Sequence, residues 1–160
     1  MKEINNFGFY HPEKYFLVAG TGDSEYDLVA FDQALINAGI ADVNLSTITS
    51  IIAPHCKRID PIPLVAGGIY AVAFASIQSN KAGEIISSAV AVSQPDDKSK
   101  AGLIMELSDR LPKDLVEKKV KEMASMGMKN RDIHLFSIET ISVEHIVKNV
   151  GCTFAGVVEL

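Results

Sequence analysis

A serine directly behind a peptide carbonyl, inside a strand-like run, is the first candidate for chemistry in this chain. The run reads VNLSTITSII over residues 43–52, and its Thr49-Ser50 bond lies near the end. A serine hydroxyl beside a strained carbonyl can attack its own backbone, and the residue can then become a reactive ketone. Serine and threonine alternating with apolar residues are also ordinary strand composition, so a structural role for Ser50 is the alternative.

Two carboxylates stand in apolar surroundings. Asp32 falls within the apolar stripe expected for a helix, next to Phe31, where an ionised carboxylate is costly unless a cation or several donors meet it. Glu106 stands in the run GLIMEL at 102–107, and strand alternation puts it on the same side as Ile104. Apolar surroundings favour the neutral carboxyl that a general acid needs, whereas a glutamate at a strand end could instead reach solvent.

Other familiar patterns are incomplete. Gly-Thr-Gly at 20–22 is similar to a dinucleotide-binding turn, but Glu25 occupies the third glycine position and nearby aspartates would repel a pyrophosphate. No GxSxG elbow is present, which disfavours a conventional serine hydrolase. Histidines and cysteines lack metal-ligand spacing, so we expect no metal site and two free thiols; these residues are His11, His55, His134, His145, Cys56 and Cys152.

Composition indicates one compact domain spanning residues 1–160. The chain is 48% hydrophobic and has no long polar tract, which allows a substantial core. Its net charge of −5 argues against a nucleic-acid or anionic-membrane partner, because such surfaces require clustered Lys and Arg. No apolar stretch approaches the about 18 residues of a membrane span, and the first six residues lack a signal-peptide core. We therefore expect a cytoplasmic protein.

The elements that must position these residues can be read from periodicity and turn signals. A first strand over 15–20 is expected to end in a turn at 20–23, followed by a helix that Gly39 stops. A second helix is expected from 111 to about 126, ending at Gly127. Strands are expected at roughly 43–52, 69–78, 85–93, 101–107, 131–145 and 151–159, with a loop at 53–63. The apolar stripe of the first helix would be Leu28, Phe31, Leu35 and Ile36.

The strand regions predict the fold class. They are apolar on both faces, for example at 69–77 and 101–107, so one sheet face alone would not hide them. Two stacked, mainly antiparallel sheets, each with a helix on its outer face, satisfy this pattern. We expect an α+β protein with the four layers of an αββα sandwich.

Six short segments together carry a family resemblance. They are AFDQALINAGI at 30–40, VNL at 43–45, ITSI at 48–51, GLIME at 102–106, VEH at 143–145 and GCTFA at 151–155. In this order and spacing the chain resembles the pyruvoyl-dependent arginine decarboxylases. Each segment alone is a weak signal, but the combination spans nearly the whole chain and is specific.

The resemblance implies that the chain cuts itself between Thr49 and Ser50. The Ser50 hydroxyl would attack the Thr49 carbonyl and convert the amide to an ester. Elimination would then release residues 1–49, and hydrolysis with loss of ammonia would leave a pyruvoyl group at the head of residues 50–160. This ketone would be the electron sink for decarboxylation, with no pyridoxal phosphate and no metal.

The resemblance also implies roles for three further residues. Glu106 would protonate the carbanion, Asn44 would assist cleavage by donating to the developing oxyanion, and Asp32 would meet the substrate guanidinium in a two-bond contact. The family places its active site between subunits, which implies a homotrimer or a pair of trimers. Thr49 stands where many relatives have serine, but only its carbonyl is needed. The loop after Ile52 is more basic than in the family pattern.

Three functions follow as expectations. The first is decarboxylation of L-arginine to agmatine and carbon dioxide, a reaction that serves polyamine synthesis or acid consumption. The second keeps the pyruvoyl chemistry but acts on another basic amino acid such as histidine. The third is an uncleaved, non-catalytic oligomeric binding paralogue.

Overall fold

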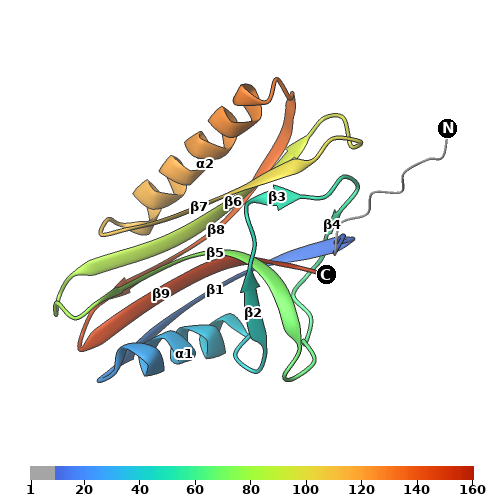
Figure 1. Ribbon diagram of the computed structural model, residues 1–160. Coiled ribbons are helices and arrows are strands. Elements are labelled where there is room, and N and C mark those ends of the chain that lie inside the picture. Colours follow the sequence, from blue (N-terminus) through green and yellow to red (C-terminus); the bar gives the residue numbers. More distant parts are fainter. Residues whose placement is uncertain (1–9) are drawn as a thin grey trace.

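The computed structural model describes residues 10–160, which form two sheets and two helices (Figure 1). This confirms the expected α+β class with two sheets. The helices are α1 (Asp27–Ala38) and α2 (Lys113–Asn130). The strands are β1 (Lys14–Ser24), β2 (Asn44–Thr47), β3 (Ile51–Ile52), β4 (Lys57–Arg58), β5 (Ile69–Ser79), β6 (Ile85–Pro95), β7 (Gly102–Asp109), β8 (Leu135–Ile146) and β9 (Val150–Glu159).

The two sheets differ in strand direction. The five-stranded sheet has the order β2-β5-β9-β1-β4; its three central strands are antiparallel, whereas the edge strands β2 and β4 pair in parallel. The four-stranded sheet has the order β3-β7-β6-β8 and is antiparallel throughout. The sheets are therefore mainly antiparallel, as predicted, and parallel pairing is confined to the two edge strands of the larger sheet.

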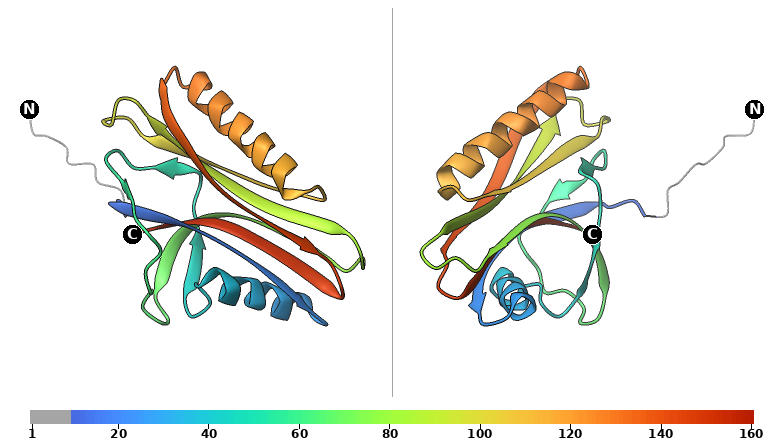
Figure 2. Two further views of the ribbon diagram at one scale, coloured as in Figure 1. Left: turned by 180° about the vertical axis from the view of Figure 1, so that it is seen from behind. Right: turned by 60° about the vertical axis from the view of Figure 1, so that its left-hand side comes forward.

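The sheets stack face to face, and each helix covers one outer face (Figures 1 and 2). The core between the sheets includes Tyr15, Val92 and Ile104. A second core, around Phe154, lies between α1 and the five-stranded sheet, and a third, around Val120, lies between α2 and the four-stranded sheet. Apolar burial on both faces of each sheet is what the strand composition requires.

The turn predicted at residues 20–23 is wrong, because β1 continues through these residues to Ser24. Gly20 and Gly22 are strand residues that lie directly under α1. A Cβ atom at Gly22 would stand 2.0 Å from the Ala30 carbonyl oxygen, and one at Gly20 would stand 2.2 Å from the Ala34 carbonyl oxygen. These glycines therefore allow the helix backbone to approach the strand closely.

The same close approach decides which face of α1 is buried. The buried residues of this helix are Ala30, Ala34 and Leu35. Of the predicted stripe, Leu35 is buried and Phe31 packs against the core, but Leu28 and Ile36 are 77% and 56% exposed, so that half of the prediction is wrong. Asp32 is exposed as well, and its expected place on a core face is wrong. The helix packs on Gly20 and Gly22 of β1 through Ala30 and Ala34, and this contact decides which of its faces is buried. Gly39 ends the helix as predicted, with a φ of 78°.

The second helix passes through its predicted end. Gly127 is buried inside α2, where an added Cβ atom would lie 2.3 Å from Leu103 Cδ2. The missing side chain lets the helix pack closely against the β7 side chains Leu103 and Met105, and the helix continues to Asn130. Within residues 10–160, neither helix has the length and apolarity needed to cross a membrane.

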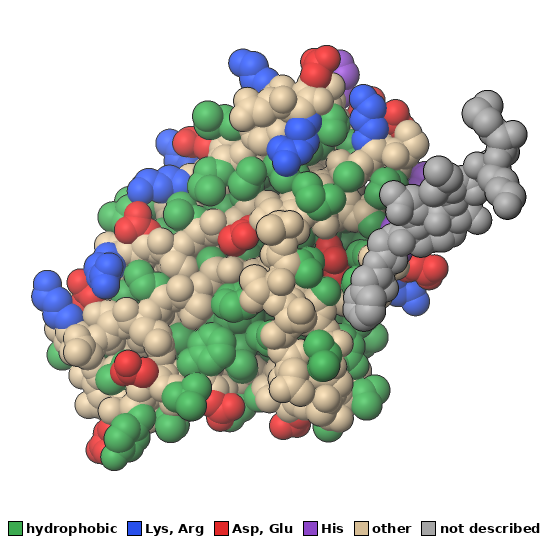
Figure 3. All heavy atoms as spheres, viewed as in Figure 1, with side chains coloured by type: hydrophobic (Ala, Val, Ile, Leu, Met, Phe, Trp, Pro, Cys, Tyr) green, Lys and Arg blue, Asp and Glu red, His purple; other side chains and the backbone are tan. Residues whose placement is uncertain are grey.

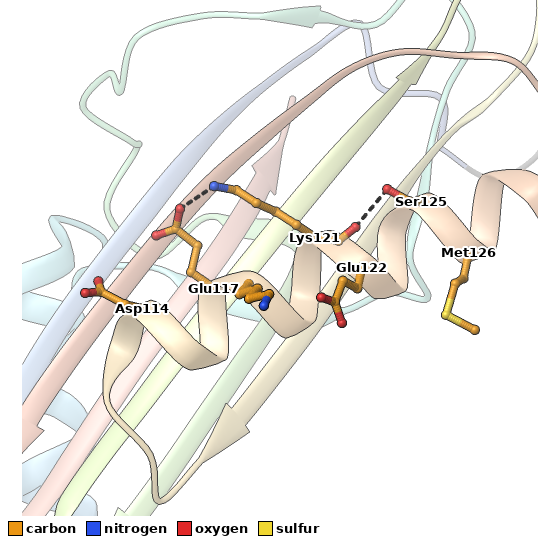
Figure 4. Close-up of a pocket in the computed structure, with 7 residues that line it drawn as sticks. Asp114, Glu117, Lys121, Glu122, Ser125 and Met126 are labelled. Atoms are coloured by element: carbon orange, nitrogen blue, oxygen red, sulfur yellow. Dashed lines mark hydrogen bonds and ion pairs between the residues drawn. The ribbon is translucent and has the colours of Figure 1, made fainter.

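Glu117 fastens α2 to β8. Its carboxylate accepts from Lys121 Nζ at 2.6 Å, Ser142 Oγ at 2.6 Å and Thr140 Oγ1 at 3.0 Å; Figure 4 shows the Lys121 contact. These hydrogen bonds, of which the one from Lys121 has the largest effect, lower the pKa of Glu117 to about 2. A lowered pKa in the folded state means that the stabilisation is present above the ordinary value of 4.5 and is lost as the pH falls towards 2.

The strand expected at 43–52 is divided between the two sheets. β2 pairs with β5 in the five-stranded sheet, whereas β3 pairs with β7 in the four-stranded sheet. Residues 48–50 form the crossing between the sheet edges (Figure 1). Ser50 is therefore the last residue before the chain enters the second sheet.

Candidate active site

The crossing places Ser50 against Glu106. The Ser50 hydroxyl lies 2.9 Å from Oε1 and 3.0 Å from Oε2 of Glu106. The pairing of β3 with β7 is responsible, because the Ile104 N–H donates to the Ser50 carbonyl at 2.8 Å and Glu106 follows two residues later. Two residues that are 56 positions apart in sequence thus form one serine–carboxyl pair.

Glu106 lies on the inward side of its strand. Ile104 packs in the core between the sheets, and strand alternation directs Glu106 to the same side. The carboxyl is half-buried, and this burial raises its pKa above the ordinary value of 4.5, while the hydrogen bond from Ser50 partly opposes the rise. The apolar environment expected from the sequence is therefore present, and the neutral carboxyl is favoured.

The peptide bond before Ser50 is held in a tight turn. The Ile51 N–H donates to the Thr49 carbonyl oxygen at 2.8 Å, so the turn closes around Ser50. Thr49 is exposed and Ser50 is partly buried. The Ser50 hydroxyl, the Thr49 carbonyl and the Glu106 carboxyl thus lie within this turn and the adjoining β7.

Sequence reasoning missed the backbone donors at Ile51 and Ile104. Every residue except proline carries an N–H group, so the residue type gives no signal. Their positions depend on the break between β2 and β3 and on the register with β7. A prediction of these two donors would have required a prediction of the break at residues 48–50.

Asn44 and Asp32 lie outside the Ser50–Glu106 pair. Asn44 is exposed on β2, and its side-chain amide donates to the Gly67 carbonyl at 3.2 Å. Asp32 is exposed on α1, and the five-stranded sheet stands between that helix and the sheet that carries Glu106. The structure of this chain therefore brings together Ser50, Thr49 and Glu106, but not Asn44 or Asp32.

A surface hollow lies elsewhere on the molecule. It has a volume of about 800 Å³ and runs along the outer side of α2, where Asp114, Lys118 and Met126 are among its lining residues (Figure 4). None of the residues with candidate chemistry lines it. Over residues 10–160, no cluster of three or more His, Cys, Asp or Glu side chains could hold a metal ion. Cys56 and Cys152 are free, as predicted, and both are buried.

Fold and site define an α+β protein in which a serine–carboxyl pair lies where the chain crosses between two stacked sheets. A sequence model described as "Pyruvoyl-dependent arginine decarboxylase (PvlArgDC)" matches residues 14–159. The chain therefore belongs to the pyruvoyl-dependent arginine decarboxylase family.

Curated relatives support this assignment, and each has the name pyruvoyl-dependent arginine decarboxylase. The protein from Methanocaldococcus jannaschii is 46% identical over 156 residues, which is 96% of this chain and 94% of the relative. The protein from Methanococcus aeolicus is 41% identical over 91% of this chain and 88% of its own length. The protein from Pyrococcus abyssi is 33% identical over 86% of this chain and 88% of its own length.

The residues at the crossing fit the pyruvoyl group that the family name specifies. A serine can be converted to a pyruvoyl group when its hydroxyl has a proton acceptor and the preceding carbonyl is accessible. Both oxygens of Glu106 lie within hydrogen-bond distance of the Ser50 hydroxyl, and Thr49 is exposed. The prosthetic group would thus come from Ser50 itself.

Proposed function

We propose that this chain cleaves itself between Thr49 and Ser50 and then decarboxylates L-arginine to agmatine and carbon dioxide. The contact between Ser50 and Glu106 carries the proposal, because it lies at the expected cleavage junction of a family member. The single αββα domain, residues 1–160, then consists of two fragments, 1–49 and 50–160. Its substrate is a free amino acid of the cytoplasm, and we place the enzyme there.

Cleavage begins at the Ser50 hydroxyl. Its oxygen attacks the Thr49 carbonyl carbon, and the proton passes to Glu106 in its ionised form, which the hydrogen bond from Ser50 favours against the effect of burial. The Thr49–Ser50 C–N bond breaks as the nitrogen takes up a proton. The resulting ester loses the Ser50 Cα proton and breaks its Cβ–Oγ bond, which frees the Thr49 carboxylate. Water then hydrolyses the dehydroalanine at position 50, and ammonia leaves.

Glu106 has a second task during decarboxylation. The pyruvoyl carbonyl supplies the electron sink for the bond that breaks. Glu106 is half-buried and its pKa is raised, so it holds a proton at a pH where an exposed glutamate has lost it. It donates this proton to the substrate Cα after carbon dioxide has left.

Asp32 binds the guanidinium of a substrate held by a neighbouring protomer. Within one protomer a sheet separates Asp32 from Glu106, so the two cannot contact the same substrate. Asp32 lies between Leu28 and Ile36 on the exposed side of α1, an apolar stripe suited to contact with a second copy. In Figure 3 the lower face, over α1 and β2, presents mainly apolar and acidic side chains, whereas Lys and Arg lie chiefly over the α2 half and the rim. We propose a homotrimer or a pair of trimers. Asn44 assists cleavage from β2, where its side-chain amide donates to the Gly67 carbonyl.

Purified wild-type protein tests the proposal directly. We expect two fragments with a junction at 49/50, a hydrazine-reactive end on the larger fragment, and carbon dioxide release from arginine at a rate at least about 100-fold above lysine, ornithine or histidine. A comparable rate with histidine would support the alternative substrate. Full-length protein that persists at every pH and incubation time would support the binding paralogue.

Asp32→Asn should weaken arginine turnover and leave self-cleavage intact. Loss of a charged partner for the guanidinium is expected to lower kcat/KM for arginine by about 100-fold, or roughly 3 kcal/mol. Steady-state carbon dioxide release and gel analysis of the fragments measure the two effects. Asp42→Asn, which removes the same charge from an exposed position beyond α1, should retain turnover within about twofold. Unchanged kcat/KM in Asp32→Asn would contradict the binding role.

A further inference from the structure

A backbone N–H points at the carbonyl that self-cleavage must attack. The Ile51 N–H donates to the Thr49 oxygen at 2.8 Å, across a turn that contains only Ser50. Among residues 10–160, the non-glycine residues with positive φ are His55 and Asp132, so Ser50 has the inverse form of this turn. The scissile carbonyl is thus polarised by a fixed donor before any reaction.

The neighbouring sheet explains why this N–H is available. Ile51 stands opposite Leu103 on β7, one residue after the hydrogen-bonded Ser50–Ile104 pair, and the alternation of an antiparallel pair therefore directs its N–H away from β7. The Ser50 carbonyl, in contrast, accepts from the Ile104 N–H of β7 at 2.8 Å. Pairing with β7 therefore fixes Ser50 from one side and leaves the Ile51 donor directed at the reacting bond.

We propose that the Ile51 N–H is the oxyanion donor for self-cleavage; this rests on the function proposed above. When the Ser50 oxygen adds to the Thr49 carbonyl carbon, the C=O double bond opens and its electron pair settles on the Thr49 oxygen. A donor already 2.8 Å from that oxygen stabilises the charge without any reorganisation. When the C–N bond breaks, the electron pair on the Thr49 oxygen forms the C=O double bond again. The donor therefore acts only in the step that converts the amide to the ester.

The position of Asn44 strengthens this assignment. By resemblance Asn44 was expected to supply the oxyanion donor, but its side-chain amide donates to Gly67 in this structure. The Ile51 N–H is the group whose hydrogen bond reaches the Thr49 oxygen. Asn44 then assists by holding the start of β2 rather than by contact with the reacting atoms.

An amide-to-ester replacement removes this donor without changing the side chain. Incorporation of 2-hydroxy-3-methylpentanoic acid at position 51 replaces the N–H of Ile51 with an ester oxygen. We expect self-cleavage of the freshly folded precursor to slow by about 100-fold, the usual effect of losing one oxyanion donor. An ester at this point makes the Ser50 Cα proton more acidic and would accelerate the later elimination. Slower cleavage must therefore arise in the acyl shift.

Ile48 offers a matched control in the same segment. Its N–H donates to the Val72 carbonyl at 3.3 Å, so the same hydroxy acid at position 48 removes one backbone hydrogen bond and does not contact the Thr49 carbonyl. We expect this variant to cleave within about threefold of the wild type. A second measurement uses Ser50→Ala protein, which stays intact, with ¹³C-labelled threonine carbonyls. The ester at position 51 removes the hydrogen bond to the Thr49 carbonyl, so the stretching frequency of that carbonyl should rise.

The outcomes separate this inference from the proposed function. Equal slowing by the esters at 48 and 51, or normal cleavage with the ester at 51, would overturn the role of the Ile51 N–H while cleavage itself stands. An unshifted carbonyl frequency would overturn it as well. Wild-type protein that never cleaves would instead overturn the proposed function, on which the inference depends.

Discussion

Ser50→Ala yields a full-length chain that releases no carbon dioxide from arginine. Alanine lacks the hydroxyl that attacks the Thr49 carbonyl, and without that attack no pyruvoyl group can form. Because both cleavage and the electron sink depend on one oxygen atom, we expect turnover to fall to background rather than by a measurable factor. Intact mass and a radiometric assay with carboxyl-labelled arginine measure the two losses on the same sample.

The fold of this variant should be intact. Removing the hydroxyl deletes one hydrogen bond to Glu106, and we expect the free energy of unfolding to change by about 1 kcal/mol or less. Ser46→Ala is the matched control, because Ser46 is exposed on β2 in the segment before the crossing. We expect the Ser46→Ala protein to cleave itself normally. Cleavage of Ser50→Ala at the same junction would show that another nucleophile acts there.

Local rules found the chemical groups of the site but not the crossing that joins them. Strand alternation predicted the inward direction of Glu106, and the structure agrees. The same rules treated residues 43–52 as one strand, because every residue in that run suits a strand. The break at 48–50 arises from the demand that the chain change sheets, which is a property of the whole fold. The contact between Ser50 and Glu106 follows from that break.

The first helix shows a different limit. Periodicity of large apolar residues predicted a buried stripe of Leu28, Phe31, Leu35 and Ile36. Leu35 is buried and Phe31 packs against the core, whereas Leu28 and Ile36 are exposed. The buried side is selected by Gly20 and Gly22 in β1, whose missing side chains admit the backbone of α1 at Ala30 and Ala34. The face of α1 that packs on its own sheet therefore consists of small residues. A second, exposed face carries Leu28, Ile36 and Asp32. In the proposed assembly, a second protomer would cover the latter.

Glu106→Gln removes most turnover and leaves self-cleavage slower but complete. Glutamine cannot donate a carboxyl proton to the substrate Cα, and loss of a general acid lowers the rate by about 100-fold or more. Its side-chain oxygen still accepts from the Ser50 hydroxyl, so the precursor remains correctly placed. Single-turnover release of carbon dioxide from fully cleaved protein isolates this effect, with Glu122→Gln on the exposed side of α2 as the control.

The pH profile of the same pair of proteins identifies the acid. Burial raises the pKa of Glu106, so its neutral form persists to a higher pH than that of an exposed glutamate and is lost as the pH rises through the raised value. Wild-type turnover should therefore decline on the alkaline side of that pKa, and this decline should be absent in Glu106→Gln. A mutant with full turnover, or with the wild-type profile at a reduced rate, would assign the proton to another donor. The Glu106 carboxyl both contacts Ser50 and protonates the substrate. A Glu106→Gln protein that cleaves completely but lacks the alkaline decline would separate its role in cleavage from its role in decarboxylation.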